Sequence, residues 1–149
     1  MTYEKYEKRR AEINKWFDKY IKETFTKINQ FGHLENHINK NDDYLKKRCM
    51  KEKIHVSTFI GEESDILEMV LNEILNHREE LIEYLADIED NDVWEISGKL
   101  NSSVTGKAYL NSPEHKWEDG AISCKSFKIC FKKNAKNPNC IIITSAYPY

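Results

Sequence analysis

The spacing of the apolar residues changes near Val93, and few kinds of fold accommodate such a change. Before that point, apolar residues recur every three or four positions, as on one face of an amphipathic helix. After it, short alternating or β-branched runs are separated by Ser, Asn, Gly and Pro, as in strands joined by loops. Helices followed by an antiparallel sheet make an α+β domain, so we predict that fold class.

Helical spacing covers two long stretches. Residues 3–30 are predicted to form one amphipathic helix, whose aromatic stripe we interpret as core packing. Residues 65–87 repeat the spacing, and Asn76 and His77 mark a break that divides them into two shorter helices. We interpret His77 as a structural histidine because it lies on the apolar face of these helices.

Two runs near the C-terminus show the period of a strand, and residues 53–60 suit a strand or an extended loop. Residues 121–132 alternate, with Phe127, Ile129 and Phe131 on one face and Lys128 on the other. In residues 140–149 the same period places four side chains on a shared face: Ile141, Ile143, Ser145 and Tyr147. Two hydroxyls would then lie side by side.

The net charge of −2 hides an uneven distribution along the 149 residues. Thirteen acidic residues and one basic residue lie between Glu62 and Glu95, whereas five lysines and no acidic residue follow Asp119. We expect an acidic surface and a basic surface, and the second would suit a polyanionic ligand. A solvated helix face and an ordinary lysine-rich hairpin would explain the same pattern.

Several classes of protein and of site lack support in the sequence. No apolar run approaches the ~20 residues that span a bilayer, and the N-terminus lacks the apolar segment of a signal peptide. The four cysteines show no CxxC spacing, so we expect reduced thiols, although a bridge to Cys140 from Cys124 or Cys130 stays open. P-loop, GxGxxG, GxSxG and HExxH motifs are absent.

The stretch GHLENHINKNDDYLKKR combines two histidines with an arginine. His33 and His37 lie four residues apart, which on a helix means one face. Arg48 follows His37 by eleven residues, and a straight helix would place it roughly 16 Å farther along the axis. Asn and Asp cap helices well and suit helix interiors poorly. A second helix should therefore start at Asn41 or Asp42 and let the chain fold back.

An imidazole, a guanidinium and two hydroxyls can cleave RNA without a metal. RNA carries its own nucleophile, the 2′-hydroxyl, so the protein needs a base, a cation at the phosphate and a donor near the leaving oxygen. Histidine titrates near neutral pH, arginine binds two phosphate oxygens at once, and tyrosine and serine donate hydrogen bonds. From the residues alone, a half-built metal site, or an ordinary turn and strand, remain alternatives.

Four short motifs resemble, in their order, a known family: GHLENHI, the arginine eleven residues after its second histidine, STF at residues 57–59, and the terminal SAYP. Together they resemble the ribonuclease A-like toxin domain at the C-termini of bacterial contact-dependent growth inhibition (CdiA-type) proteins. The resemblance implies a connecting helix at residues 1–30 and a toxin domain at residues 31–149. It also implies a curved antiparallel sheet of the ribonuclease A-like kind, without a disulfide framework.

The resemblance implies a role for each matching residue. His37 would be the catalytic histidine and Arg48 the catalytic arginine. Ser145 and Tyr147 fall on the terminal Thr-Ala-Tyr-Pro run of the family, with serine in place of threonine. We take His33 as a further candidate catalytic residue. The candidate substrate-binding residues are Thr58, Thr144 and Lys128.

We therefore expect a metal-independent endoribonuclease toxin that acts in interbacterial competition and needs no cofactor. Transesterification would leave a 2′,3′-cyclic phosphate, and tRNA is one candidate substrate. The resemblance further implies a cognate immunity protein, a monomeric toxin module, export as part of a larger protein, and action in the cytoplasm of the target cell. Two alternatives remain: a toxin of the barnase, colicin and RelE grouping, and a non-catalytic RNA-binding or protein-interaction module.

Overall fold

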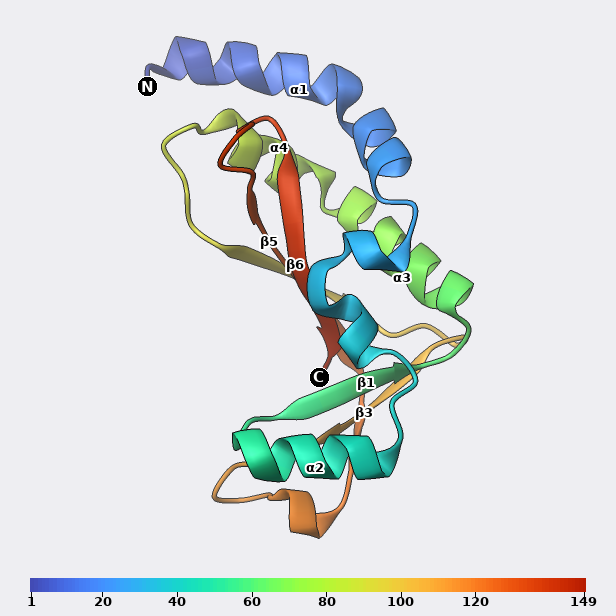
Figure 1. Cartoon of the computed structure of the whole chain (residues 1–149). Helices are drawn as coiled ribbons and strands as arrows, with labels where there is room; N and C mark the ends of the chain where they lie inside the picture. Colours follow the sequence, from blue (N-terminus) through green and yellow to red (C-terminus); the bar gives the residue numbers. More distant parts are fainter.

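Six strands form two antiparallel sheets, in the orders β1-β3-β4 and β2-β5-β6, and helices pack around them (Figure 1). The computed structural model describes all residues, 1–149. The helices are α1 (Tyr3–Thr24), η1 (Ile28–Gln30), η2 (Gly32–His37), α2 (Asp42–Glu52), α3 (Glu63–Asn76), α4 (Arg78–Ala86) and η3 (Trp117–Asp119), of which the η elements are 3-10 helices. The strands are β1 (Val56–Ile60), β2 (Trp94–Lys99), β3 (Thr105–Tyr109), β4 (Ile122–Cys124), β5 (Ser126–Lys133) and β6 (Ile141–Pro148). The predicted α+β class is confirmed.

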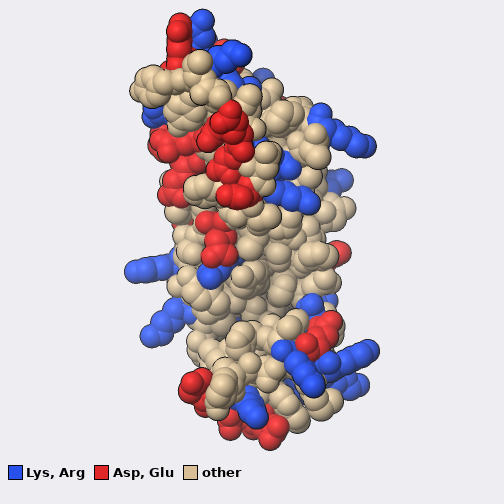
Figure 2. Space-filling model, turned by 90° about the vertical axis from the view of Figure 1, so that its left-hand side faces the viewer, with Lys and Arg blue, Asp and Glu red and all other residues tan.

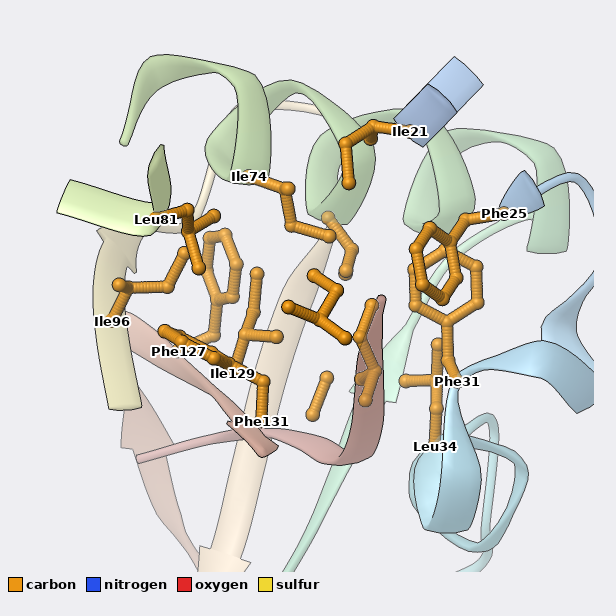
Figure 3. Close-up of a cluster of buried hydrophobic side chains, with 14 of the residues drawn as sticks. Ile21, Phe25, Phe31, Leu34, Ile74, Leu81, Ile96, Phe127, Ile129 and Phe131 are labelled. Atoms are coloured by element: carbon orange, nitrogen blue, oxygen red, sulfur yellow. The ribbon is translucent and has the colours of Figure 1, made fainter. Parts of the chain in front are cut away.

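The main core lies between the β2-β5-β6 sheet and the helices α1, α3 and α4 (Figure 3). On α3 the buried side chains follow the helical spacing of three and four: Ile66, Met69, Val70 and Ile74. On β5 the buried side chains alternate, as predicted: Phe127, Ile129 and Phe131. Packing of these apolar faces, more than helix propensity, therefore holds the helices on the sheet.

The helical pair has the predicted break. α3 ends at Asn76, α4 begins at Arg78, and His77 lies between them. The imidazole of His77 is held on both sides, because Nε2 lies 3.0 Å from a carboxylate oxygen of Glu73 and Nδ1 lies 3.0 Å from one of Glu80. His77 therefore has the structural role that the sequence predicted.

The N-terminal helix is shorter than predicted. α1 ends at Thr24, so the prediction of one helix to residue 30 is wrong at its C-terminal end. The side-chain oxygen of Gln30 accepts hydrogen bonds from the backbone N–H groups of Thr26 and Lys27, at 2.8 Å each. Because these two N–H groups bond to the Gln30 side chain and not to carbonyls one turn earlier, the α-helix ends and a turn follows it.

α1 nevertheless packs into the main core and against α4. Phe17 and Ile21 are fully buried. The guanidinium of Arg9 donates hydrogen bonds to the backbone carbonyls of Leu85 and Ala86, at 2.9 and 3.1 Å. The division into a connecting helix at residues 1–30 and a toxin domain at residues 31–149 stays a prediction.

The predicted strand at residues 121–132 is in fact two strands in different sheets. β4 pairs with β3, whereas β5 pairs with β2 and β6, and the chain passes from one sheet to the other at Lys125. The backbone carbonyl of Lys125 accepts a hydrogen bond from Leu100 N–H at 3.0 Å. The buried residue of β4 is Cys124, whereas those of β5 are Phe127, Ile129 and Phe131, so the parity of the buried residues changes across the crossing.

β6 contains a β-bulge at Thr144, which the predicted alternation did not allow for. Cys130 on β5 pairs with Ser145, but the next residue, Phe131, pairs with Ile143, so Thr144 is the extra residue. The buried residues of β6 are therefore Ile141 and Ile143 before the bulge and Ala146 and Pro148 after it. The expectation that Ile141 and Ile143 share a face with Ser145 and Tyr147 is wrong, because the bulge turns the strand over.

The surface shows the uneven charge of the sequence. Figure 2 shows acidic side chains gathered on the upper part of one face, toward the end of the molecule that holds α1 and α4. Basic side chains lie along the edges and, mixed with acidic ones, at the opposite end. All four cysteines are free. None of the helices combines the length and the apolar character needed to cross a bilayer.

Candidate active site

A cavity of about 650 Å³ lies where the two sheets meet, and both sheets contribute to its walls. β6 contacts β1 and β3 there, close to the C-terminus (Figure 1). The lining residues are His37, Arg48, Ile54, His55, Ser57, Ala108, Leu110, Ile122, Lys128, Ser145, Tyr147, Pro148 and Tyr149. Five of the residues predicted for the site from sequence therefore lie around one space: His37, Arg48, Lys128, Ser145 and Tyr147.

The chain folds back between the histidines and Arg48, as the Asn and Asp residues predicted. Asn39 adopts a left-handed φ of 49°, a conformation that Asn tolerates better than most residues. The side chain of Asn39 donates to the carbonyl of Gly61 and accepts from its N–H. Asn41 then caps α2, because its side-chain oxygen accepts a hydrogen bond from Tyr44 N–H at 2.8 Å. Arg48 on α2 and His37 can therefore line the same cavity.

His33 lies outside the cavity, and the type of helix explains why. η2 is a 3-10 helix with three residues per turn, so residues four apart point in different directions. His33 is exposed, whereas His37 is half-buried and lines the cavity. The expectation that both histidines share one face is wrong, because it assumed an α-helix.

The imidazole of His37 is held in one orientation. Its Nδ1 lies 2.9 Å from the backbone carbonyl of Ser57 and donates a hydrogen bond to it. In the neutral ring this leaves a lone pair on Nε2. The ring also stacks on that of Tyr147, with 5.7 Å between the centroids and 39° between the planes. A histidine held in this way has the tautomer that a general base requires.

Burial and nearby positive charge keep His37 neutral. Burial is the largest cause that lowers the pKa of His37, and the positive charges of Arg48, His33 and Lys40 lower it further. The hydrogen bond to Ser57 acts in the opposite direction and does not cancel them.

Arg48 carries an ion pair that the sequence analysis did not predict. Its Nε donates to a carboxylate oxygen of Glu52 at 2.7 Å, between residues four apart on α2. A guanidinium has five N–H groups, and the Glu52 carboxylate is the one protein group that bonds to Arg48. The remaining N–H groups can therefore bind a phosphate in the cavity.

Tyr147 and Ser145 project from β6 after the bulge, into the cavity. Burial raises the pKa of Tyr147, so its hydroxyl keeps its proton and can donate a hydrogen bond. Lys128, opposite Tyr147 on β5, lies 3.3 Å from a carboxylate oxygen of Glu95 and 4.8 Å from the ring centroid of Tyr149. The hydrogen bond to Glu95 raises the pKa of Lys128, which keeps the ammonium charged.

Two of the expected substrate-binding residues lie elsewhere. Thr58 is fully buried, where its hydroxyl accepts a hydrogen bond from Lys40 N–H and donates one to the carbonyl of Phe59. Thr144, the bulge residue, donates its hydroxyl to the carbonyl of Cys130 at 3.2 Å. Neither lines the cavity, so the structure gives both threonines a role in backbone geometry and not in substrate contact.

The sequence analysis did not single out His55 or the apolar residues beside it. Ile54 and His55 precede β1, and Leu110 and Ile122 flank the ends of β3 and β4. One signal was available, because His55 has the same parity as Ser57 in the predicted strand at residues 53–60. The apolar residues lie next to strands whose pairing could not be predicted from the sequence.

No group of three or more His, Cys, Asp or Glu side chains is placed to hold a metal ion. That catalysis needs neither a metal nor a cofactor stays a prediction.

The comparisons with known proteins agree with this architecture. The bacterial CdiA-CT RNAse A domain matches residues 32–148. None of the curated proteins matches the chain. The fold is similar to that in the crystal structure of the CdiA-CT/CdiI complex from Y. kristensenii 33638, with a TM-score of 0.64 and 16% sequence identity. The alignment covers 78% of this chain and 97% of that chain.

These findings confirm the resemblance that the motifs indicated. The structural likeness, at its low sequence identity, speaks for the fold, and the family match extends over most of the chain and all of the cavity-lining residues except Tyr149. The family match also decides between the two ribonuclease scaffolds considered for the sequence. The chain therefore belongs to the family of bacterial CdiA-CT RNAse A domains.

Proposed function

We propose that this domain is a ribonuclease toxin that cleaves RNA by attack of the 2′-hydroxyl on the adjacent phosphate. One observation supports this most strongly: His37, Arg48 and Tyr147 come from three distant parts of the chain and line one cavity. An imidazole, a guanidinium and a phenol are the groups that this reaction requires.

In the proposed mechanism, His37 is the general base. Nε2 removes the proton from the 2′-hydroxyl, while the Ser57 carbonyl holds the Nδ1 proton in place. The low pKa of His37 keeps Nε2 free to accept a proton at neutral pH. The 2′-oxygen then forms a bond to phosphorus, the bond to the 5′-oxygen breaks, and that oxygen leaves as a hydroxyl with a proton from Tyr147, which solvent water restores as His37 gives up its own.

Cations and hydroxyls would stabilise the charge that develops on the phosphate. The N–H groups of Arg48 that Glu52 leaves free bind two of the phosphate oxygens, and Lys128 adds a second positive charge. Tyr147 and Ser145 donate hydrogen bonds to the phosphate and assist the departure of the 5′-oxygen. The product would carry a 2′,3′-cyclic phosphate, and no step requires a metal ion. Total RNA and tRNA are the substrates to test first.

We also propose a cognate immunity protein as the partner of the domain. The similar solved structure is a complex of CdiA-CT with CdiI, and a toxin of this kind needs an inhibitor in the cell that makes it. Export as part of a larger protein, entry into the cytoplasm of a target cell and action as a monomer belong to the same proposal.

The proposed activity is tested with purified protein and total RNA in EDTA. Wild-type protein should degrade the RNA, whereas His37→Ala and Arg48→Ala should lose roughly 100-fold or more of the rate, because each removes a group that acts in the transition state. His77→Ala and Arg78→Ala are the matched controls, since both residues form ion pairs on the helical side and lie outside the cavity. Full activity in the His37 and Arg48 variants would contradict the assignment of the site.

Expression in bacteria separates this proposal from a non-catalytic RNA-binding module. A ribonuclease toxin should arrest growth, and the His37→Ala variant should not. A binding module would leave growth unchanged in both cases, and its RNA affinity would fall steeply as the salt concentration rises.

A further inference from the structure

The walls of the cavity differ in chemistry according to the sheet that supplies them. β5 and β6 of one sheet, together with η2 and α2, supply the polar and charged residues His37, Arg48, Lys128, Ser145 and Tyr147, and the end of β6 adds Pro148 and Tyr149. The other wall comes from one end of the β1-β3-β4 sheet and is mainly apolar: Ile54, Ala108, Leu110 and Ile122. In the phosphate chemistry proposed above, every side chain that contacts the substrate belongs to the first wall, and the second wall contributes only the Ser57 carbonyl that orients His37.

Strand pairing explains why the apolar residues gather. β1 and β3 run antiparallel with Val56 opposite Tyr109, so the residues that precede β1 face those that follow β3. Ala108 in turn pairs with Ile122 on β4. Ile54 is 44% exposed, although it lines the cavity. An apolar wall that is open to solvent beside a cationic wall suits a ligand that combines a flat apolar ring with an anion.

His55, in this apolar wall, has the opposite tautomer to His37. The backbone N–H of Asn111 donates a hydrogen bond of 3.0 Å to Nδ1 of His55. Nδ1 must therefore carry a lone pair, and the proton of the neutral ring is on Nε2. In His37 the reverse holds, because Nδ1 donates to Ser57 and Nε2 is the acceptor. One cavity thus contains a histidine suited to accept a proton and a histidine that presents a fixed N–H donor.

From these observations we propose that the end of the β1-β3-β4 sheet binds the nucleobase next to the phosphate that is cleaved. Ile54 and Leu110 cover a face of the base, and His55 Nε2–H donates a hydrogen bond to an acceptor atom on its edge. His55 is a specificity-determining residue in this arrangement and takes no part in proton transfer. The proposal rests on the ribonuclease function, because it assigns the base of that substrate.

The test compares the affinity for nucleoside 3′-monophosphates with the affinity for inorganic phosphate, by isothermal titration calorimetry. The ratio of the two isolates the contribution of base and ribose from that of the phosphate. For the wild-type protein the best of the four nucleotides should bind at least about tenfold more tightly than inorganic phosphate, because the base would bury part of the apolar wall. Equal affinities would overturn the proposal.

Variants of Ile54 and His55 test whether this wall causes the tighter binding of nucleotides. Ile54→Ala should lower the ratio roughly fivefold, because it removes apolar surface that the base would bury. Ile60→Ala is its matched control, because Ile60 is 40% exposed on β1 and lies outside the cavity. His55→Asn keeps an oxygen near the position of Nδ1 to accept from Asn111 N–H, and its shorter side chain has no N–H at the position of Nε2, so it should lower the ratio and the discrimination among bases. His55→Gln restores an N–H near the position of Nε2 and should recover both.

The outcomes separate this proposal from the ribonuclease function. If Ile54→Ala and His55→Asn are folded by thermal melting and keep the wild-type ratio, the nucleobase site is refuted even when the protein cleaves RNA. If the wild-type protein binds nucleotides with the expected ratio and leaves RNA intact, the ribonuclease function is refuted and the nucleobase site is supported.

Discussion

Gly32 is the position at which a single methyl group should disturb the site most. η2 begins there with φ of +60°, and a Cβ at this position would lie 2.1 Å from the carbonyl oxygen of Thr144 and 2.4 Å from its carbonyl carbon. Both atoms belong to the backbone of the β6 bulge, so no side-chain rotation can relieve the overlap. Gly32→Ala must therefore move η2 away from β6.

The expected loss of stability has two parts. Alanine in a left-handed conformation costs about 1–2 kcal/mol, and an overlap with well-packed neighbours costs about 1–3 kcal/mol, occasionally more. Gly32→Ala should thus lower the free energy of unfolding by about 2–5 kcal/mol, toward the upper end because backbone must shift. The movement would also separate His37 on η2 from Tyr147 on β6, so ribonuclease activity should fall in the protein that remains folded.

Urea unfolding and RNA cleavage test this prediction together. Gly120→Ala is the control, because Gly120 also has a positive φ, of +93°, but nothing lies within 4 Å of a Cβ built there. Gly120→Ala should lose only the stability that an unfavourable backbone conformation costs, about 1–3 kcal/mol, and should keep its ribonuclease activity. The reasoning is refuted if Gly32→Ala is no less stable than Gly120→Ala, or if it is folded and cleaves RNA at the wild-type rate.

The contacts lead to four further predictions. Because the pKa of His37 is lowered, the acidic limb of the pH profile of kcat/KM should lie below the usual histidine value of about 6.5. By the same linkage His37 takes up more protons in the unfolded state at acidic pH, so its contribution to the free energy of unfolding should fall as the pH decreases from about 6.5. The raised pKa of His77 acts in the opposite direction, so urea titrations should compare His77→Ala with the His77→Ala/His37→Ala double variant, and the stability difference between them should fall toward acidic pH. Phe17→Ala should lower the free energy of unfolding by about 3–5 kcal/mol, because Phe17 is fully buried in the main core. Tyr3→Ala is the control and should cost little, because Tyr3 is 78% exposed. Equal losses in the two variants would contradict the packing of α1. Glu52→Gln should strengthen the binding of inorganic phosphate roughly two- to fivefold, because it removes the negative charge that competes with phosphate for Arg48 and keeps an oxygen that can accept from Nε. Weaker binding would show that the charge of Glu52 serves instead to orient Arg48.

The sequence predicted those features that depend on a repeated pattern. Burial every three or four residues defined α3 and the break at His77, and alternation defined the buried face of β5. The cap at Asn41 followed from one side chain that suits one position. The convergence of His37 and Arg48 followed from the expected break at Asn41 and Asp42, whereas the place of Tyr147 beside them rested mainly on the family resemblance.

Structural features that depend on one extra residue in a strand, or on which strands pair, could not be predicted from the sequence. The extra residue at Thr144 changes the direction of every later side chain in β6, and an alternating pattern is as regular with it as without it. The Ser145 and Tyr147 pair was unaffected, because both lie after the bulge. The wall that contains His55 depends on which end of β3 lies beside β1, and that pairing is a property of the fold.

The helix that carries the histidines shows a third kind of limit. GHLENHI has no feature that separates a 3-10 helix from a short α-helix, yet the choice decides whether His33 points with His37 or away from it. The tight packing of Gly32 on the Thr144 carbonyl, which brings η2 against β6, was visible only in the structure.

The most direct test of the proposed reaction is the chemical identity of the RNA ends that the protein produces. Total RNA treated with purified protein in EDTA should yield fragments that end in a 2′,3′-cyclic phosphate, identified by mass spectrometry, and the His37→Ala protein should yield none. Fragments that end in a 3′-hydroxyl, or the same cyclic ends at the wild-type rate from His37→Ala, would contradict a reaction in which His37 activates the 2′-hydroxyl.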